Sequence, residues 1–314
     1  MIICCGEALI DMLPIEISSQ KEQKGTAYQP VSGGAIFNTA IALGRLGAKT
    51  GFCGGISTDL FGEQLCQSLS ESNVDYSYAS RQEAPTTLSF VKFTDGQASY
   101  AFYDENTAGK LFQGNNIKEL PEELEAFHFG AISLIQEPCG TSIEELATSA
   151  KDKCVLSFDP NIRTSFITDP DEYRQRIKRL LSISDIIKVS DEDLLWFSPE
   201  TKPEDFAQQQ LRQGPSIVLF TEGSQGATAY SQNSTIELES KKVQVKDTIG
   251  AGDSFNAGFL SSLSEQGILS KSKLKDLTEQ QLSIALNKAN RVAAFTVTQS
   301  GAVPPWAEEL TNID

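Results

Sequence analysis

Histidine is nearly absent from this chain of 314 residues, which contains a single one, His128. A metal site with several histidine ligands therefore cannot be built within one chain, and a serine–histidine–aspartate triad would depend on this one residue. The nucleophile motif G-x-S-x-G and the phosphate loop G-x-x-x-x-G-K-[ST] are also missing from the sequence. Because His128 lies in an apolar run, we interpret it as a packed residue and expect carboxylates to do general-base work.

Long apolar runs, C-x-x-C pairs and an excess of positive charge are missing as well. No apolar stretch approaches the roughly 20 residues that span a bilayer. The six cysteines lie mostly in strand-like runs and are interpreted as reduced core residues. The 26 Lys and Arg against 42 Asp and Glu give a net charge of −16, which disfavours nucleic acid and anionic membranes as partners. Since the N-terminus also lacks the pattern of a secretory signal, we expect a cytoplasmic protein.

Short apolar runs alternate with amphipathic stretches along most of the chain. Six runs predict strands, at residues 2–5, 50–56, 128–134, 155–159, 186–189 and 217–221. Amphipathic periodicity predicts helices at residues 36–46, 61–72, 142–150, 171–181, 203–213, 253–266 and 280–298. This alternation indicates an α/β fold, with a mostly parallel sheet covered by helices on both faces. In such sheets ligands bind beyond the C-terminal ends of the strands.

Two segments interrupt this alternation. Residues 12–31 are mostly polar, with only a weak alternation of apolar and polar side chains. In residues 86–103 this alternation is clear on both sides of Gly96, which predicts a hairpin. We expect both to form a small antiparallel β flap, either a lid that excludes water from a site or a decoration. Because no linker or repeat divides the sequence, we expect a single domain over 1–314 with lid insertions at about 12–31 and 86–106.

The segment 247–255 carries the strongest chemical signal. Residues 241–249 alternate and predict a strand, Gly250 and Gly252 break it, and a helix is expected from Asp253. The first turn of such a helix leaves backbone N–H groups unpaired, which together form an anion site.

Asp253 is an unusual residue at an anion site. It either caps the helix or accepts a proton from a hydroxyl that attacks a phosphoryl group. Because a helix N-terminus lowers the pKa of a carboxyl group, we expect Asp253 to be a weak base. A dinucleotide-binding turn is the alternative, but Phe255 stands where its third glycine belongs.

Polar residues and glycines also follow other predicted strands. Asp11 follows the first strand, and Gly33 and Gly34 precede a helix, where they allow close approach to a ligand. Asn38 falls outside the buried stripe of that helix, so its amide can meet hydroxyl groups.

Two further strand ends allow two interpretations each. Arg163 follows the strand 155–159 and either binds a phosphate or pairs with Asp159, and the residues alone favour the ion pair. Gly223 and Gly226 follow the strand 217–221 and either form a hairpin or let the backbone approach a nucleotide.

Together these motifs resemble those of the ribokinase-like (PfkB) carbohydrate kinases. The marks are GGA-x-x-N-x-A at 33–40 with GRLG at 44–47, and DT-x-GAGD-x-F at 247–255. Within the family, GEALID at 6–11, TTL at 86–88 and FY-x-E-x-TA at 102–108 are most similar to bacterial fructokinases. The resemblance implies a ribokinase-like three-layer α/β/α sandwich with a small β lid. It also implies ATP-dependent phosphorylation of a sugar, with a primary hydroxyl of D-fructose as the expected acceptor.

The resemblance also implies a role for each candidate residue. Asp253 corresponds to the catalytic base, and the amides of Gly250, Ala251, Gly252 and Asp253 correspond to an anion hole. The sugar-binding positions correspond to Asp11, Gly33, Gly34, Asn38, Phe102 and Arg163. The nucleotide-site segments contain Lys188, Thr221, Gly223, Gly226 and Asn290.

The implied cofactors are ATP, Mg²⁺ and K⁺. Asp247, with the carbonyls of Ile249 and Gly301, resembles the family's monovalent-cation loop. The family motif N-x-x-E, associated with magnesium, reads Ser190-Asp191-Glu192-Asp193 here, so Asp193 is the residue that would fill that role. The implied partners are a small sugar and ATP, together with a second subunit bound through the lid.

Two alternatives remain open at this point. The chain could be another kinase of the same family, acting on 2-keto-3-deoxygluconate, ribose or a nucleoside. It could also be a sugar- or nucleotide-binding module in which Asp253 only caps a helix. Sugar-dependent release of ADP would discriminate between these alternatives.

Overall fold

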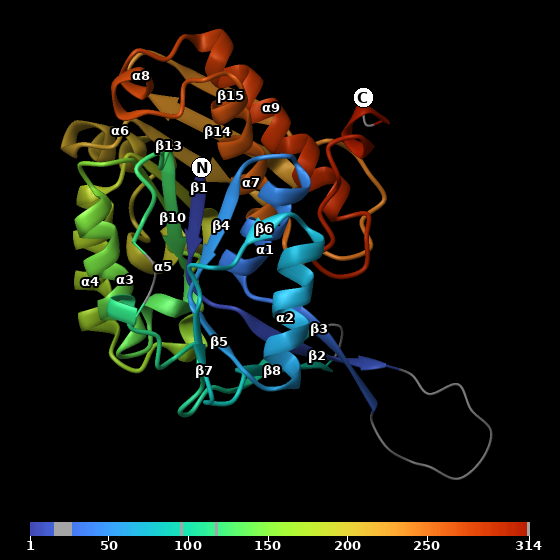
Figure 1. Ribbon diagram of the computed structural model, residues 1–314. Coiled ribbons are helices and arrows are strands. Elements are labelled where there is room, and N and C mark those ends of the chain that lie inside the picture. The colour runs from blue at the N-terminus through green and yellow to red at the C-terminus, as the bar shows by residue number, and fades with distance from the viewer. Residues whose placement is uncertain (16–26, 95–96, 117–118, 313–314) are drawn as a thin grey trace.

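A large sheet forms the centre of the computed structural model, which describes residues 1–15, 27–94, 97–116 and 119–312 (Figure 1). Within these ranges nine strands pair in the order β15-β14-β13-β12-β11-β10-β1-β4-β6. Their bounds are β1 Ile2–Cys5, β4 Thr50–Cys53, β6 Val74–Asp75, β10 Ala126–Gly130, β11 Val155–Asp159, β12 Ile186–Ser190, β13 Ile217–Thr221, β14 Gly226–Ser231 and β15 Thr235–Glu239. Neighbours are parallel from β6 to β13, and β14 and β15 are antiparallel at one edge. The predicted mostly parallel sheet is confirmed.

Helices cover both faces of this sheet because successive strand residues point to opposite sides. Ile2 and Cys4 pack into one helical layer, whereas Ile3 and Cys5 pack into the other. The first layer contains α1 Ala35–Arg45, α2 Leu60–Glu71, α7 Ala251–Glu265, α8 Lys271–Lys275 and α9 Glu279–Thr296. The second contains α3 Cys139–Ala150, α4 Pro170–Ile183, α5 Asp191–Phe197 and α6 Pro203–Gln213. The expected three-layer α/β/α architecture is therefore present.

The two insertions pair with one another in a small sheet that projects from one end of the molecule (Figure 1). Its order is β3-β2-β8-β9, with β2 Leu9–Ile15, β3 Ala27–Gly33, β8 Leu88–Thr94 and β9 Gln97–Tyr103. The β2–β3 and β8–β9 pairs are antiparallel as expected, but β2 and β8 are parallel. The predicted turn at Gly96 and much of the first insertion lie outside the described residues. A further short parallel pair joins β5 Gly55–Ser57 to β7 Ser80–Gln82.

The predicted strand at 241–249 is wrong. In the described segment between β15 and α7, no residue belongs to a strand, and Val245 is 57% exposed. The backbone N–H of Lys246 donates to the carbonyl of Val297, just beyond the end of α9, at 2.8 Å. The alternating valines therefore lack a neighbouring strand, because the chain here follows a helix instead of the sheet.

The predicted strand at 128–134 ends early, at Gly130. Residues Ala131–Leu134 form a short 3₁₀-helix (η2), and Ala131 has a positive φ of 57°. This bend turns the chain across the C-terminal end of the sheet.

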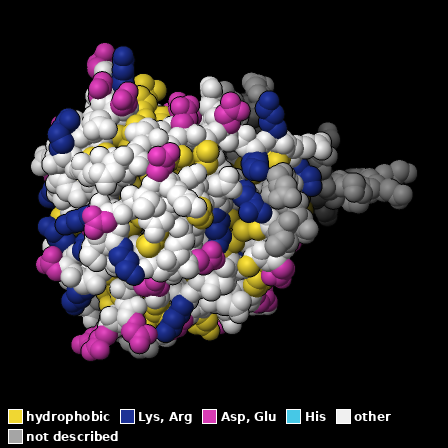
Figure 2. Space-filling model, turned by 90° about the horizontal axis from the view of Figure 1, so that it is seen from above, with side chains coloured by type: hydrophobic (Ala, Val, Ile, Leu, Met, Phe, Trp, Pro, Cys, Tyr) yellow, Lys and Arg dark blue, Asp and Glu magenta, His cyan; other side chains and the backbone are white. Residues whose placement is uncertain are grey.

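His128 is a packed residue, as expected. It is buried in β10, its Nδ1 lies 3.0 Å from the Ser157 hydroxyl, and burial lowers its pKa to about 3. The six cysteines are likewise buried free thiols. On the face seen in Figure 2, acidic and basic side chains are interspersed. No helix among the described residues is long and apolar enough to cross a bilayer.

Candidate active site

A cavity of about 270 Å³ lies where β1, β10, β11 and β12 end, between the central and small sheets. It brings together many of the predicted site residues, namely Asp11, Gly34, Asn38, Phe102, Arg163, Lys188, Ile249, Gly250, Ala251, Gly252 and Asp253. It also contains residues that were not predicted, namely Glu7, Leu9, Ala35, Ala131, Ile132, Asn161, Phe166 and Thr248. Its position agrees with the rule that ligands bind at the carboxyl ends of parallel strands.

The N-terminus of α7 forms one wall of this cavity. Gly250 caps the helix in the left-handed region, with φ of 76°, and a side chain there would also collide with Ala302. The helix begins at Ala251, two residues before the predicted start, so Asp253 lies within its first turn. The Ala251 N–H donates to the carbonyl of Thr248 at 3.3 Å.

Three backbone donors of this turn remain available to an anion. Among the described residues, no acceptor pairs with the N–H groups of Gly250, Gly252 and Asp253. A positive charge lies beside them, because the Lys188 ammonium is 3.5 Å from the position that a Cβ would take at Gly252. Amides and ammonium together suit a phosphoryl group.

Asp253 is a carboxylate held at this anion site. It is 7% exposed, and the Asn38 side-chain amide donates to its Oδ2 at 2.9 Å. Burial raises the pKa of Asp253 to about 7, although Asn38, Arg163 and Lys188 oppose the rise. The expectation of a weak base is therefore wrong, since desolvation outweighs the helix N-terminus. A carboxyl group that titrates near neutral pH is suited to accept a proton.

Asn38 itself is more buried than predicted. The expectation placed it off the buried stripe of α1, yet it is 8% exposed because α1 packs against both the sheet and α7. Its side chain consequently lines the cavity, and its amide donates to Asp253.

Lys188 and Asp159 form a buried ion pair beneath the cavity. The Lys188 ammonium lies 3.3 Å from Asp159 Oδ2, and the Asn256 amide donates to the same oxygen at 2.7 Å. The favoured pairing of Arg163 with Asp159 is wrong, because the Asp159 carboxylate pairs with the ammonium of Lys188 on the neighbouring strand β12. Arg163 instead donates to the carbonyl of Ile162 and extends, exposed, along the cavity.

The ion pair keeps the ammonium charged. Burial alone would lower the pKa of Lys188, but the carboxylates of Asp159 and Asp193 outweigh burial and raise it. A permanently cationic group therefore stands beside the anion site.

Asp11 lies on the opposite wall, in β2. A Cβ at Gly33 would stand 2.3 Å from its Oδ2, so glycine is needed for β3 to approach the carboxylate. Burial raises the pKa of Asp11 to about 6, against the opposing effect of the Ser89 hydroxyl. Gly33 thus lies behind Asp11, while Gly34, with φ of 108°, lines the cavity at the start of α1.

Glu7 is a functional candidate that the sequence reasoning missed. Its Oε1 accepts the N–H of Ala35 at 2.9 Å and that of Ile36 at 3.4 Å, at a helix whose own N-cap is glycine. Its buried Oε2 has no hydrogen-bond partner among the described residues, since the nearby Ser133 hydroxyl donates to a backbone carbonyl. The available signals were separate ones: an acidic residue just after the first strand, and a helix that begins after two glycines and so lacks a side-chain cap of its own.

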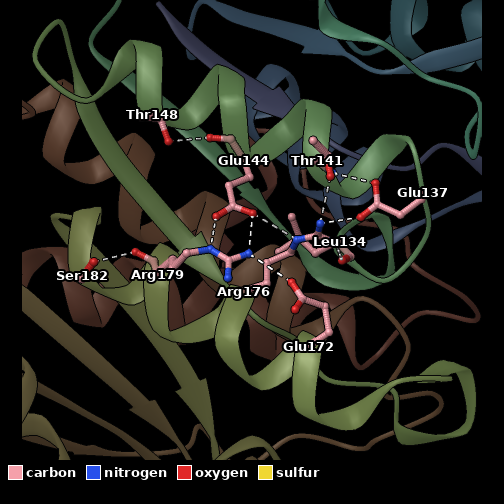
Figure 3. Close-up of polar contacts among 9 residues, drawn as sticks. All are labelled: Leu134, Glu137, Thr141, Glu144, Thr148, Glu172, Arg176, Arg179 and Ser182. Atoms are coloured by element: carbon pink, nitrogen blue, oxygen red, sulfur yellow. Dashed lines mark hydrogen bonds and ion pairs between the residues drawn. The ribbon is translucent and has the colours of Figure 1, made fainter.

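The η2 turn, which contributes Ala131 and Ile132 to the cavity, is held from behind by Arg176 (Figure 3). Arg176 is buried in α4 and donates to the carbonyl of Leu134 at 2.8 Å. It also pairs with Glu137 and Glu144, and the latter binds Arg179 as well. This network supports the cavity wall without reaching the cavity.

The predicted nucleotide residues other than Lys188 lie outside this cavity, on β13, on β14, in the turn between these strands and on α9. Thr221 ends β13, pairs with Ser190 of β12, and is followed by Gly223 in a turn. Gly226 begins β14 opposite Glu239, whose carbonyl accepts the Asn290 amide at 3.5 Å. These four residues therefore gather around the end of β13, which is the neighbour of the strand β12 that carries Lys188.

Asp193 is placed as a structural cap. Its Oδ1 accepts the Ile162 N–H at 2.6 Å, and its Oδ2 accepts the N–H and hydroxyl of Ser190 at 2.9 and 2.7 Å. Both oxygens are thus occupied, and the residue is outside the cavity. Among the described residues, no cluster of three or more His, Cys, Asp or Glu could hold a metal ion.

Asp247, Ile249 and Gly301 do lie together. Asp247 accepts the Ile249 N–H at 3.1 Å and the Gly301 N–H at 2.9 Å. Asp247 therefore contacts the N–H groups of Ile249 and Gly301, whereas the expected cation loop uses the carbonyl groups of these two residues. The carbonyl of Gly301 accepts the N–H of Val303. This loop is nonetheless continuous with Gly250, and so fixes the anion turn.

Fold and site together define a ribokinase-like phosphotransferase. The sequence pattern described as pfkB family carbohydrate kinase matches residues 1–309. A fructokinase of Rhizobium leguminosarum bv. trifolii is 48% identical over 282 residues, which cover 90% of this chain and 85% of the relative. Fructokinase-1 of Zea mays is 33% identical, covering 98% and 95%. The crystal structure of Xylella fastidiosa fructokinase with bound ATP superimposes with a TM-score of 0.89 at 28% identity, covering 99% and 97%. The chain belongs to the pfkB family of carbohydrate kinases.

Proposed function

We propose that this enzyme is an ATP-dependent fructokinase that transfers a phosphoryl group to a primary hydroxyl of D-fructose. The observation that carries the proposal is the position of Asp253, buried beside three free amides and a lysine ammonium. The names of the relatives, which are fructokinases, support fructose as the acceptor. The bound ATP in the Xylella fastidiosa fructokinase supports ATP as the donor.

The geometry suggests a division of roles around the cavity. Asp11 and the Asn38 amide hold sugar hydroxyls, and Gly34 allows the sugar to approach the backbone. The amides of the α7 turn and the Lys188 ammonium stabilise charge on the transferring group. Because the transition state is loose, Asp253 mainly orients the attacking hydroxyl and accepts its proton late.

Magnesium fits this site only as an ion carried by the nucleotide. The described residues offer no preformed cluster of carboxylates, and both oxygens of Asp193 already accept hydrogen bonds. Mg²⁺ commonly binds through substrate phosphates with few protein ligands, and there it would neutralise phosphate charge. The nucleotide would extend from the anion turn toward Thr221, Gly223, Gly226 and Asn290.

We further propose that residues 1–314 act as one kinase domain, with the insertions at about 12–31 and 86–106 serving as a lid. The lid also supplies the contact between the two subunits of a homodimer. Sedimentation tests this contact, because a protein that is monomeric at assay concentration would refute the dimer. The buried free thiols favour a reducing compartment such as the cytoplasm.

The test is the release of ADP from ATP across a panel of acceptors. The panel contains fructose, glucose, ribose, 2-keto-3-deoxygluconate and a nucleoside, with Asp253→Asn as the matched control. Fructose should give the highest kcat/KM. Preference for another acceptor would reassign the substrate. If no acceptor in the panel stimulated the release of ADP, the protein would be a binding module and not a kinase.

A further inference from the structure

Two aromatic rings that line the cavity contact one another, one from the small sheet and the other from the body of the protein. Phe102 lies on β9 of the small sheet, and Phe166 ends the 3₁₀ turn Thr164–Phe166 that follows β11. Both line the cavity, and their ring centroids are 4.4 Å apart at an interplanar angle of 63°. This is an edge-to-face contact between the small sheet and the body of the protein.

Phe102 belongs to a row of side chains on the cavity face of the small sheet. Asp11 of β2 is opposite Ser89 of β8, and Ser89 is opposite Phe102 of β9. Side chains opposite one another across strands share a face, so Asp11 and Phe102 move together when the sheet moves. The contact of Phe102 with Phe166 therefore also fixes the height of Asp11 above the cavity.

The base of the small sheet is held independently of this contact. Asp59 accepts the backbone N–H of Thr86 at 2.8 Å and its hydroxyl at 2.6 Å. Thr87 donates its hydroxyl to that of Thr107 at 2.8 Å, which ties the entering strand to the leaving one. Loss of the aromatic contact would thus release the cavity side of the sheet while its attachment remains intact.

We propose that Phe102 and Phe166 form an aromatic latch that holds the small sheet closed over the bound sugar, with Phe166 as a positioning residue for Asp11. The inference rests on the proposed sugar kinase function. An edge-to-face pair changes an equilibrium by about 2- to 10-fold, which is the scale expected for the latch. Because the nucleotide residues lie at β13–β15 and α9, the latch acts on the sugar and leaves ATP binding unchanged.

A double-mutant cycle tests the latch, using Phe102→Ala, Phe166→Ala and the double variant. Phe166→Ala should raise the KM for fructose about 2- to 10-fold in the natural background and leave the KM for ATP unchanged. In the Phe102→Ala background the same change should have no further effect on the KM for fructose. Phe166→Leu, which keeps bulk without the ring, should resemble Phe166→Ala.

The matched control is Tyr103→Ala, the next residue on β9. Tyr103 is 64% exposed and packs on Phe90, on the other face of the small sheet. Its replacement should leave both KM values unchanged. Thermal unfolding of every variant verifies that the fold is retained.

The outcomes separate the latch from the proposed function. Independent, multiplicative effects of the two replacements would overturn the latch, as would an unchanged KM for fructose in Phe166→Ala. If the natural enzyme prefers another sugar, fructose is refuted as the substrate, and the same cycle is measured with that sugar. A coupled cycle on any sugar supports the latch.

Discussion

The raised pKa of Asp253 gives the sharpest prediction of the catalytic account. A rise from 3.8 to about 7 means that the surroundings of Asp253, burial above all, make its ionised form about 4 kcal/mol less favourable than in water. The base is therefore ionised only above that pH, and activity should be lost as the pH falls through it. With a pKa of 7, the ionised fraction drops from about one half at pH 7 to about 1% at pH 5, so kcat/KM should fall about 50-fold.

The assay is kcat/KM for fructose from pH 5 to 9 at saturating MgATP. Asn38→Ala supplies the control, because removing the amide that donates to Asp253 should move the acid limb to higher pH. Titration of ATP itself would not respond to that change. Asp253→Asn should keep the fold, because asparagine has nearly the same size as aspartate and Gly250, not Asp253, caps α7; it should lose at least ~10²-fold in kcat. A flat profile, or near-normal turnover of Asp253→Asn, would refute the reasoning.

Four further predictions concern the surroundings of Asp253. Asp11→Ala should cost about 1.5–3 kcal/mol in kcat/KM for fructose with little change for ATP, and equal losses for both would contradict a sugar-binding role. Glu7→Ala should lower the free energy of unfolding by about 1–3 kcal/mol in urea titrations, because two N–H groups of α1 lose their acceptor. Glu7→Gln should lower it by a smaller amount, and an unchanged free energy of unfolding in Glu7→Ala would argue against the capping role. Fructose should slow hydrogen exchange in residues 86–103, and unchanged exchange would rule out a lid. K⁺ should raise activity more than Na⁺ does, and Asp247→Ala should abolish this response while some activity is left. Identical rates in potassium, sodium and tetramethylammonium buffers would exclude a monovalent-cation site at this loop.

Local patterns were sufficient for most of the fold. Residues 2–5, 155–159 and 217–221 were predicted at the bounds that the strands have, because buried parallel strands are short, apolar and flanked by turn residues. Residues 241–249 show the limit of the same reasoning. Alternation reports which side chains could share a face, but a strand also needs a neighbour, and this segment lies against α9.

The sequence identified many residues of the site, but it did not predict their contacts with one another or the pKa of Asp253. Asp253 and Asn38 were identified from motifs, but their contact and the raised pKa of Asp253 depend on how α1 packs against α7. Phe166 was not predicted because its partner, Phe102, lies far away in the sequence. The role of Asp193 was readable, since Ser190-x-x-Asp193 before an apolar run resembles a capping box and the structure contains one.

The most direct test of the central claim is identification of the product by ³¹P and ¹³C NMR after incubation with MgATP and D-fructose. The account predicts one phosphate ester on a primary carbon of fructose, formed in equal amount to ADP and missing with Asp253→Asn. Inorganic phosphate without a sugar ester, or an ester on a secondary carbon, would contradict it.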